Sequence, residues 1–158
     1  MTSSDTMMQL DQQLCFALYA SSLAMTKAYK PLLEPLGLTY PQYLVMLVLW
    51  ESDGIHVSQL GERLSLDSGT LTPLLKRMES NGWLRRQRAQ EDERRVEVFL
   101  TEHGQSLKAA ARPIPGILAC ASDCSLKELQ ELTQRLHQLK QQMQSFLNTD
   151  RSRDTRPA

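Results

Sequence analysis

The stretch that decides the fold is Ser65–Gly104, SLDSGTLTPLLKRMESNGWLRRQRAQEDERRVEVFLTEHG, because the period of its apolar residues changes once. Over residues 70–81 the apolar positions follow the i, i+3, i+4, i+7 spacing of an amphipathic helix. These positions are Leu71, Leu74, Leu75 and Met78. Gly82 then suits a helix C-terminus, because glycine tolerates positive φ. Beyond Gly82 the period falls to two, which predicts strands.

A second short helix is expected just upstream. Residues 58–64 have helical spacing, and the strand-like residues 55–57 precede them. The polar turn 65–69 joins this helix to the amphipathic one. Two short helices joined by a tight polar turn are typical of a helix-turn-helix.

A β-hairpin is expected just downstream. Residues 83–88 and 95–100 alternate as strands do, and the charged loop 89–94 lies between them. A hairpin that directly follows the second helix of a helix-turn-helix is a wing. The chain is therefore expected to be mainly α with a small β-hairpin, arranged as a winged helix-turn-helix.

Helices flank this region on its N-terminal side. Residues 8–30 lack Gly and Pro and have helical apolar spacing, and we expect Pro31 and Pro35 to end that helix. Residues 41–51 are apolar nearly all round, which predicts a helix in the centre of the core.

On the C-terminal side a helix begins at residues 101–104 and is interrupted by Pro113 and Pro115. The last helix opens with Ser125 and Glu128 in capping-box spacing. A long apolar stripe follows, with steps of three and four, made of Leu126, Leu129, Leu132, Leu136, Leu139, Met143 and Phe146. Little chain remains to cover it, so the stripe suggests a dimer interface as much as a core.

Composition excludes several classes of protein. The chain has 158 residues, 41% of them hydrophobic and 23% charged, as expected for one ordinary globular domain. No apolar run approaches the ~20 residues of a membrane span, and the polar N-terminus lacks a secretory signal. We therefore expect a cytoplasmic protein without a membrane partner. Three cysteines are too few for a disulfide framework.

The sequence lacks the common signatures of enzymes. It has no glycine-rich phosphate loop, no nucleophile elbow and no paired carboxylates. Cys120 and Cys124, with single histidines at 56, 103 and 137, do not have zinc spacing. We expect no metal, no cofactor and no enzymatic activity.

Nucleic acid is the partner that the expected winged helix-turn-helix, with a local excess of basic residues, favours. Eighteen Lys and Arg balance eighteen Asp and Glu, so any basic surface must be local. Seven basic residues against four acidic ones between Lys76 and Arg95 supply it. A solvated basic face is the alternative interpretation, but the surrounding winged helix-turn-helix favours DNA. The candidate DNA-binding residues are Asp67, Ser68, Thr70, Thr72, Lys76, Arg77, Arg86, Asp92 and Arg94.

The stretch Ser65–Gly104 resembles the core of MarR-type winged-helix repressors, and Asp92-Glu93-Arg94 matches the wing signature of that family. The resemblance implies that Arg94 enters the minor groove of operator DNA, and we expect Asp92 to orient it by a charge-assisted hydrogen bond. It also implies a homodimer on half-sites ~34–36 Å apart. One domain over residues 1–158 would hold dimerisation helices at about 8–36 and 102–148, the winged helix-turn-helix at about 40–101, and a polar tail at 149–158.

A second resemblance covers the N-terminal half. Leu14–Glu51, LCFALYASSLAMTKAYKPLLEPLGLTYPQYLVMLVLWE, together with IPGIL from Ile114, is similar to the organic-hydroperoxide-responsive branch of the MarR family. This implies that Cys15 is the peroxide-reactive thiol and that Tyr29 and Tyr40 hydrogen-bond it. The resemblance also implies control of a gene for an organic-hydroperoxide-detoxifying enzyme.

The resemblance favours Cys120 of the partner subunit as the resolving thiol, with Cys124 as a bystander or backup. A small-molecule thiol, as one-cysteine members use, remains an alternative. Tyr19 follows Cys15 by one helical turn and is a further candidate for the thiolate environment.

Helix geometry constrains this sensor. Fourteen residues of straight helix separate Cys15 from Tyr29 by roughly 21 Å at 1.5 Å per residue. Tyr29 therefore cannot reach the thiol of its own helix, so any contact must cross between subunits. Oxidation of the thiolate would give a sulfenic acid and then a disulfide.

Two other functions remain open. The first is a MarR-type repressor that a non-covalent aromatic ligand releases, with Cys15 structural. The second is a thiol peroxidase with an incidental basic wing.

Overall fold

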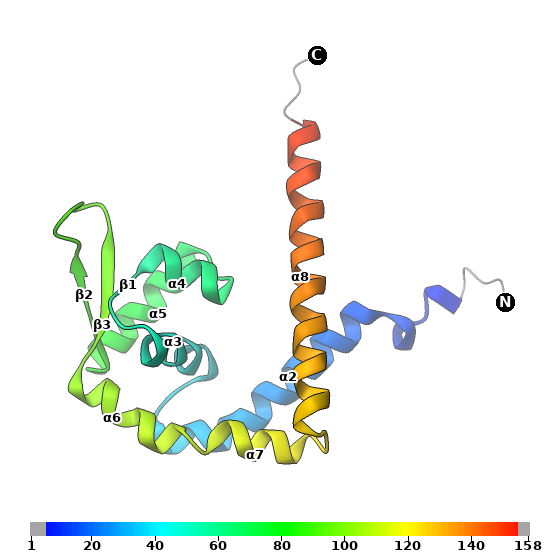
Figure 1. Cartoon of the computed structure of the whole chain (residues 1–158), viewed down its shortest axis with the longest axis horizontal. Coiled ribbons are helices and arrows are strands. Elements are labelled where there is room, and N and C mark those ends of the chain that lie inside the picture. The colour runs from blue at the N-terminus through cyan, green and yellow to red at the C-terminus, as the bar shows by residue number, and fades with distance from the viewer. Residues whose placement is uncertain (1–5, 155–158) are drawn as a thin grey trace. The chain divides into compact units, whose positions relative to one another are not determined.

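The computed structural model describes residues 6–154, and the side chains of residues 6–149 (Figure 1). Its elements are η1 (Leu10–Gln12), α2 (Leu14–Leu33), η2 (Glu34–Leu36), α3 (Tyr40–Glu51), β1 (Ile55–His56), α4 (Val57–Leu64), α5 (Ser68–Ser80), β2 (Leu84–Arg88), β3 (Val96–Leu100), α6 (Glu102–Ala111), α7 (Ile114–Ala121) and α8 (Leu126–Asp154). The chain is mainly helical, as expected. It forms two compact units, one that runs to Ile114 and one from Pro115 onward.

Helix α3 is the centre of the first unit. Its N-terminus carries a capping box, in which the Gln42 side chain accepts from the Thr39 N–H at 2.9 Å and the Gln42 N–H donates to the Thr39 hydroxyl. Tyr43 and Met46 are at most 1% exposed, as are the neighbouring Val45 and Leu49. This confirms the expectation of a central core helix over residues 41–51.

The helix-turn-helix consists of α4 and α5. Helix α5 begins at Ser68, two residues before the expected start, because the Asp67 carboxylate caps it by accepting from the Thr70 N–H at 2.8 Å. The apolar residues that carried the prediction, 71, 74, 75 and 78, are all buried. Gly82 has a φ of 75° just past the helix, as the sequence indicated.

The sheet has three strands rather than two. The order is β1-β3-β2, with both pairs antiparallel, so β1 adds a strand beside the expected hairpin. The turn before β1 is fixed by Asp53, whose carboxylate accepts from the Leu100 N–H at 2.8 Å. Gly54 follows with a φ of 72° and lies against the ring of Phe99.

The first helix differs from the expectation in two places. Gln13 is extended, so η1 ends there and α2 starts at Leu14 rather than near residue 8. The helix also continues through Pro31 to Leu33. Proline removes one hydrogen bond in the last turn, but its φ fits a helix, and Leu33 is only 1% exposed. Packing of Leu33 therefore outweighs that loss.

In the second unit the expected capping box opens α8: the Glu128 carboxylate accepts from the N–H and hydroxyl of Ser125, and the Glu128 N–H donates back to that hydroxyl. The helix continues to Asp154, so residues 149–154 are helical and not a tail, since no Gly or Pro interrupts them. The rest of the expected tail, residues 155–158, lies outside the described residues.

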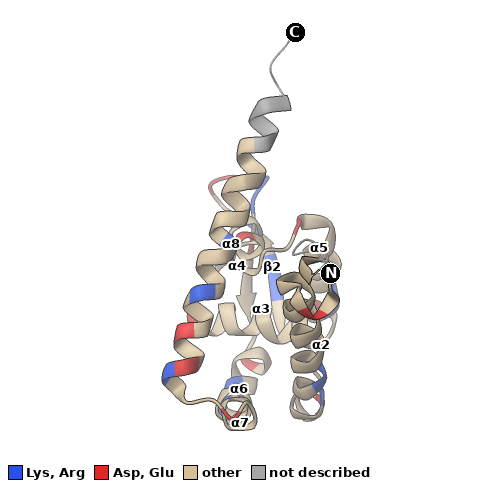
Figure 2. Cartoon of the chain, turned by 90° about the vertical axis from the view of Figure 1, so that its right-hand side faces the viewer, with Lys and Arg blue, Asp and Glu red and all other residues tan. Residues whose placement is uncertain are grey.

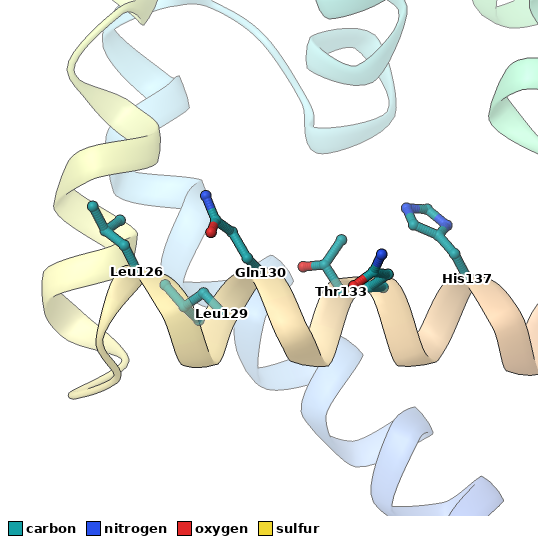
Figure 3. A pocket seen from close by; sticks show the side chains of 6 residues that line it. Leu126, Leu129, Gln130, Thr133 and His137 are labelled. Carbon is teal, nitrogen blue, oxygen red and sulfur yellow. The ribbon is translucent and has the colours of Figure 1, made fainter.

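Most of α8 is exposed. Leu126, Met143 and Phe146 are each more than half exposed. Figure 3 shows side chains projecting from its first turns, where they line a shallow groove of about 470 Å³ that α8 alone forms. The apolar stripe thus exists, and it is uncovered in a single chain.

Within the described part of the chain, no single helix is long and apolar enough to cross a membrane. Two consecutive segments, Leu14–Leu36 and Tyr40–Glu51, are long and apolar enough only when taken together, and a bend of 69° separates them.

Candidate nucleic-acid interface and thiol site

The exposed face of α5 carries polar and basic side chains. Its apolar side is buried, so Ser68, Thr70, Lys76 and Arg77 are exposed, and Thr72 is half-buried. These are candidate contacts for phosphates and base edges, because the free N–H groups of a helix N-terminus attract anions. Asp67 has a different task here. Its cap bonds with the N–H and hydroxyl of Thr70 lower the pKa of its carboxyl.

The tip of the wing is an Asx turn. The Asp92 carboxylate accepts a hydrogen bond from the backbone N–H of Arg94 at 3.0 Å, and the Asp92 carbonyl accepts from the Arg95 N–H at 2.9 Å. The Arg94 side chain was expected to donate this bond to Asp92, but the backbone N–H of Arg94 donates it instead. Asp92 shapes the loop, and the Arg94 side chain is left exposed.

Arg86 is placed differently from the other basic candidates. Its guanidinium is ion-paired with Glu79 at 2.9 Å and is only 24% exposed. The Arg86 N–H also donates to Glu79 at 2.8 Å. These bonds lower the pKa of the Glu79 carboxyl and hold β2 against the last turns of α5. Arg86 is thus a link inside the winged helix, which its charge alone did not reveal.

The basic side chains left to solvent follow β2 and the wing. The blue on β2 in Figure 2 marks arginine positions, since β2 contains no lysine. Arg85 lies over the ring of Phe99 at 4.6 Å from its centroid, and Arg88 and Arg94 are exposed. Cation–π contact holds Arg85 on the sheet without removing its charge. The unit therefore presents a local basic strip beside α5.

Three tyrosines form a cluster where α2 meets α3. The ring centroids of Tyr29 and Tyr40 are 4.6 Å apart, and Tyr43 lies 5.6 Å from Tyr29 and 6.5 Å from Tyr40. Burial, with the nearby phenols of Tyr40 and Tyr43, raises the pKa of Tyr29 to about 12. Burial also raises the pKa of Tyr40 and Tyr43. All three are therefore neutral hydroxyl donors at physiological pH.

Sequence reasoning brought Tyr29 and Tyr40 together but missed Tyr43. The signal was present, because Tyr43 follows Tyr40 by three residues on a helix and so shares its face. Tyr19 lies apart from the cluster on α2 and is 63% exposed.

Cys15 lies in the first turn of α2 with its side chain exposed. Tyr29 is on the same uninterrupted helix, so the expected separation of roughly 21 Å holds for the two residues of one chain. Cys120 lies near the end of α7 and Cys124 in the turn before α8, where its thiol donates to the Ser122 carbonyl at 3.4 Å. All three thiols are free and exposed.

A cavity of about 580 Å³ adjoins the tyrosine cluster. Leu23, Leu33 and Leu38 form part of its apolar wall, and Tyr40 also lines it. Lys27 and Lys30 add two ammonium groups. The cavity has the size and mixed lining of a small-molecule site. Among the described residues, no group of three or more His, Cys, Asp or Glu is placed to hold a metal ion.

Comparison with known proteins gives a consistent result. The family model described as transcriptional regulator SarA/Rot matches residues 27–111, more than half of the chain. The organic hydroperoxide resistance transcriptional regulator of Bacillus subtilis is 54% identical over 132 residues, which cover 84% of this chain and 90% of that protein.

Solved structures agree with this result. Reduced AbfR bound to DNA, from a protein of Staphylococcus epidermidis, matches with a TM-score of 0.76 and 35% identity, over 91% of this chain and 99% of that one. The disulfide form of AbfR matches with a TM-score of 0.60 and 39% identity, over 86% and 96%. A cysteine-to-serine mutant of MarR from E. coli matches with a TM-score of 0.64 and 25% identity, over 80% and 96%.

Proposed function

Because the chain belongs to the MarR/SarA family of winged-helix transcriptional regulators, we propose that it is a dimeric repressor that releases operator DNA when organic hydroperoxides oxidise Cys15. The family is one of regulators and not of enzymes. The observation that carries the proposal is that α2 carries an exposed Cys15 in its first turn and, near its other end, Tyr29 of the tyrosine cluster. The 54% identity to a hydroperoxide resistance regulator supports the choice of inducer.

The sensor site is completed by a second copy of the chain. Cys15 and Tyr29 stand roughly 21 Å apart along α2, so the cluster serves the thiol of the partner subunit. Two antiparallel copies of α2 would place each thiol beside the other's cluster. The phenols then donate hydrogen bonds that stabilise the thiolate.

Two exposed apolar surfaces support the dimer. On α2, Leu14, Tyr19 and Met25 are each more than half exposed, and on α8 so are Leu132 and Phe146. Apolar stripes of this length on a monomer mark association surfaces. Covering both with a second copy accounts for them together.

The chemistry of sensing takes two steps. The Cys15 thiolate attacks the terminal oxygen of the hydroperoxide, the O–O bond breaks, and the alkoxide leaves as the alcohol after it takes a proton. Cys15 is then a sulfenic acid. The thiol of Cys120 of the partner subunit attacks this sulfur, an S–S bond forms, and water leaves with the sulfenic oxygen. A dithiol reductant restores both thiols.

DNA binding uses α5 and the wing. The exposed face of α5, with Ser68, Thr70 and Lys76, enters the major groove, and Arg94 reaches the adjacent minor groove. Two copies bind two half-sites, so their spacing must match that of the operator. Oxidation moves helices at the dimer interface and spoils this spacing. A loss of 10³-fold in affinity needs only ~4 kcal/mol of differential binding.

The cavity beside Tyr40 favours a second candidate function. A space of about 580 Å³ with apolar walls, two lysines and one carboxylate, that of Glu34, can hold a small aromatic anion. In that case a non-covalent ligand releases the DNA, and Cys15 is structural.

One titration separates these functions. Reduced protein is bound to fluorescent promoter DNA, treated with stoichiometric alkyl hydroperoxide, and then treated with dithiothreitol while anisotropy is followed. We expect release and recovery for the wild type, and binding without release for Cys15→Ser. A Cys15→Ser protein that still releases with peroxide overturns the proposal. Repeated turnover of peroxide with a dithiol would instead indicate a thiol peroxidase.

A further inference from the structure

Trp50 at the end of α3 contacts the tyrosine cluster directly. Its ring meets that of Tyr43 edge to face at 6.4 Å between centroids, and Tyr43 is 1% exposed. Tyr43 in turn lies 5.6 Å from Tyr29. Trp50 is therefore one ring removed from the tyrosine that the proposed sensor uses. The proposed function assigns it no task.

The other side of Trp50 is tied to α6. Its indole Nε1–H donates to the carbonyl of Gly104 at 3.1 Å. The Trp50 carbonyl accepts from the Lys108 ammonium at 2.9 Å. One residue thus makes two hydrogen bonds to successive turns of α6, from its side chain and from its backbone.

Gly104 rests on the residue that joins α5 to β2. A Cβ at position 104 would lie 1.9 Å from the carbonyl oxygen of Trp83, so the backbones meet where only glycine fits. The same oxygen accepts from the Thr101 N–H at 3.1 Å, and the Trp83 N–H donates to Met78 in the last turn of α5 at 3.2 Å. Any displacement of α6 at Gly104 therefore presses on the junction of α5 and the wing.

We propose that Trp50 is a positioning residue that couples the tyrosine cluster to the α5–β2 junction, and so transmits the state of the sensor to the DNA-binding surface. This inference rests on the proposed function. Each contact in the chain is tight, and close-packed interiors transmit displacement instead of absorbing it. The elements at its far end carry the exposed Lys76 and Arg88.

The test is Trp50→Phe, which keeps an aromatic ring against Tyr43 and removes the donor to Gly104. The dissociation constant for operator DNA is measured for reduced and for peroxide-oxidised protein. We expect the reduced variant to bind within about threefold of the wild type. We expect the ratio of oxidised to reduced constants to fall at least tenfold, within the 5–150-fold range typical of such coupling. A purely structural role would weaken both states equally and leave this ratio unchanged.

Trp83→Phe is the matched control. Trp83 is the chain's other tryptophan and is buried, at 6% exposure. Its contacts with Thr101 and Met78 use the backbone, so the substitution leaves them in place. This variant also makes Trp50 the sole tryptophan, and we expect its emission to change on oxidation with the same time course as DNA release.

The outcomes divide cleanly. An unchanged ratio in Trp50→Phe, or Trp50 emission indifferent to oxidation in Trp83→Phe, overturns the inference while wild-type release upholds the proposed function. A wild type that does not release DNA with peroxide overturns both. Lys108→Met provides a second variant that leaves the indole intact, and we expect it to lower the ratio in the same direction.

Discussion

The carboxylate of Glu79 on α5 accepts three hydrogen bonds from Arg86 on β2, one from its backbone N–H and two from its guanidinium. Helix α5 and β2 are therefore joined by one ion pair, in which both guanidinium bonds reach the same carboxylate oxygen and the backbone N–H reaches the other. In the proposed function both elements contact DNA, so the pair would fix the angle between the two contacts.

Glu79→Gln should weaken this link, because it removes the charge and keeps a side chain of similar size. We expect a loss of about 1 kcal/mol in the free energy of unfolding at neutral pH, since the pair is partly exposed and screened. The pKa of the Glu79 carboxyl is lowered in the folded protein. Its contribution is therefore present above the ordinary value of 4.5 and is lost as the pH falls through the lowered one.

Urea unfolding at neutral and acid pH checks this. The gap between wild type and Glu79→Gln should close in acid. A gap that stays constant over that range would show that the carboxylate charge does not stabilise the fold.

Arg94→Ala should weaken operator binding and lower the slope of log affinity against log salt by about one. The structure leaves this side chain exposed at the wing, where a phosphate or minor-groove contact would release one counterion. Anisotropy titrations at several salt concentrations give the slope. Arg135→Ala, on the exposed surface of α8, is the control and should leave the slope unchanged. Equal slopes for Arg94→Ala and wild type would refute the wing assignment.

Mixed dimers test whether the thiol and the phenol come from different subunits. Cys15→Ser and Tyr29→Phe homodimers should each react slowly with peroxide. A heterodimer of the two has two sites, and in one of them an intact Cys15 faces an intact Tyr29 of the other subunit. We therefore expect each heterodimer to react at the fast rate at about half as many sites as a wild-type dimer. No recovery on mixing would mean that thiol and phenol act within one chain.

The phenols of the tyrosine cluster should ionise at a higher pH than a free tyrosine. The pKa of Tyr29 is about 12 in the folded chain against 10.0 for a free phenol. A pKa raised by folding gives stability that is present below 10.0 and lost as the pH rises toward 12. Phenolate absorbance should show a late-titrating group that Tyr29→Phe removes. A wild-type titration in which every phenol ionises near 10 would contradict the packing of the cluster.

The two C-terminal cysteines should differ on oxidation. We expect Cys120→Ser to abolish the peroxide-dependent covalent dimer on a non-reducing gel, and Cys124→Ser to leave most of it. Intact dimer in Cys120→Ser, together with its loss in Cys124→Ser, would reverse the assignment. Loss in neither variant would indicate that either cysteine can resolve the sulfenic acid. A wild type that forms no covalent dimer would indicate that a small-molecule thiol resolves it.

Much of the winged helix could be predicted from periodicity alone. The residues at 71, 74, 75 and 78 are all buried, and the change of period at Gly82 coincides with the end of α5. Such patterns are local, and burial acts on them through the same spacing. The third strand, β1, falls within residues 55–57, which are strand-like in the sequence, but its two residues have too short a pattern to predict that it pairs with β3.

What spacing did not reveal depended on the partners of each residue. Arg86 belongs to a run of basic residues, yet its guanidinium forms an ion pair with Glu79 of the preceding helix. Asp92 was expected to bind the Arg94 side chain, and it binds the backbone instead. Pro31 was expected to end α2, and burial of Leu33 carries the helix past it. Tertiary contacts decided each case.

The place of β2 in the sheet has a consequence for the free regulator. The strand order β1-β3-β2 leaves β2 with one open edge, and open edges recruit strands from other molecules. Here the Arg86 N–H on that edge donates to Glu79, so it is not open to another strand. The charged Arg85 and Arg88 lie on either side of Arg86 and its neighbour Gln87. The arginines that favour DNA therefore also guard against aggregation, which matters most when the protein has left its operator and nothing covers them.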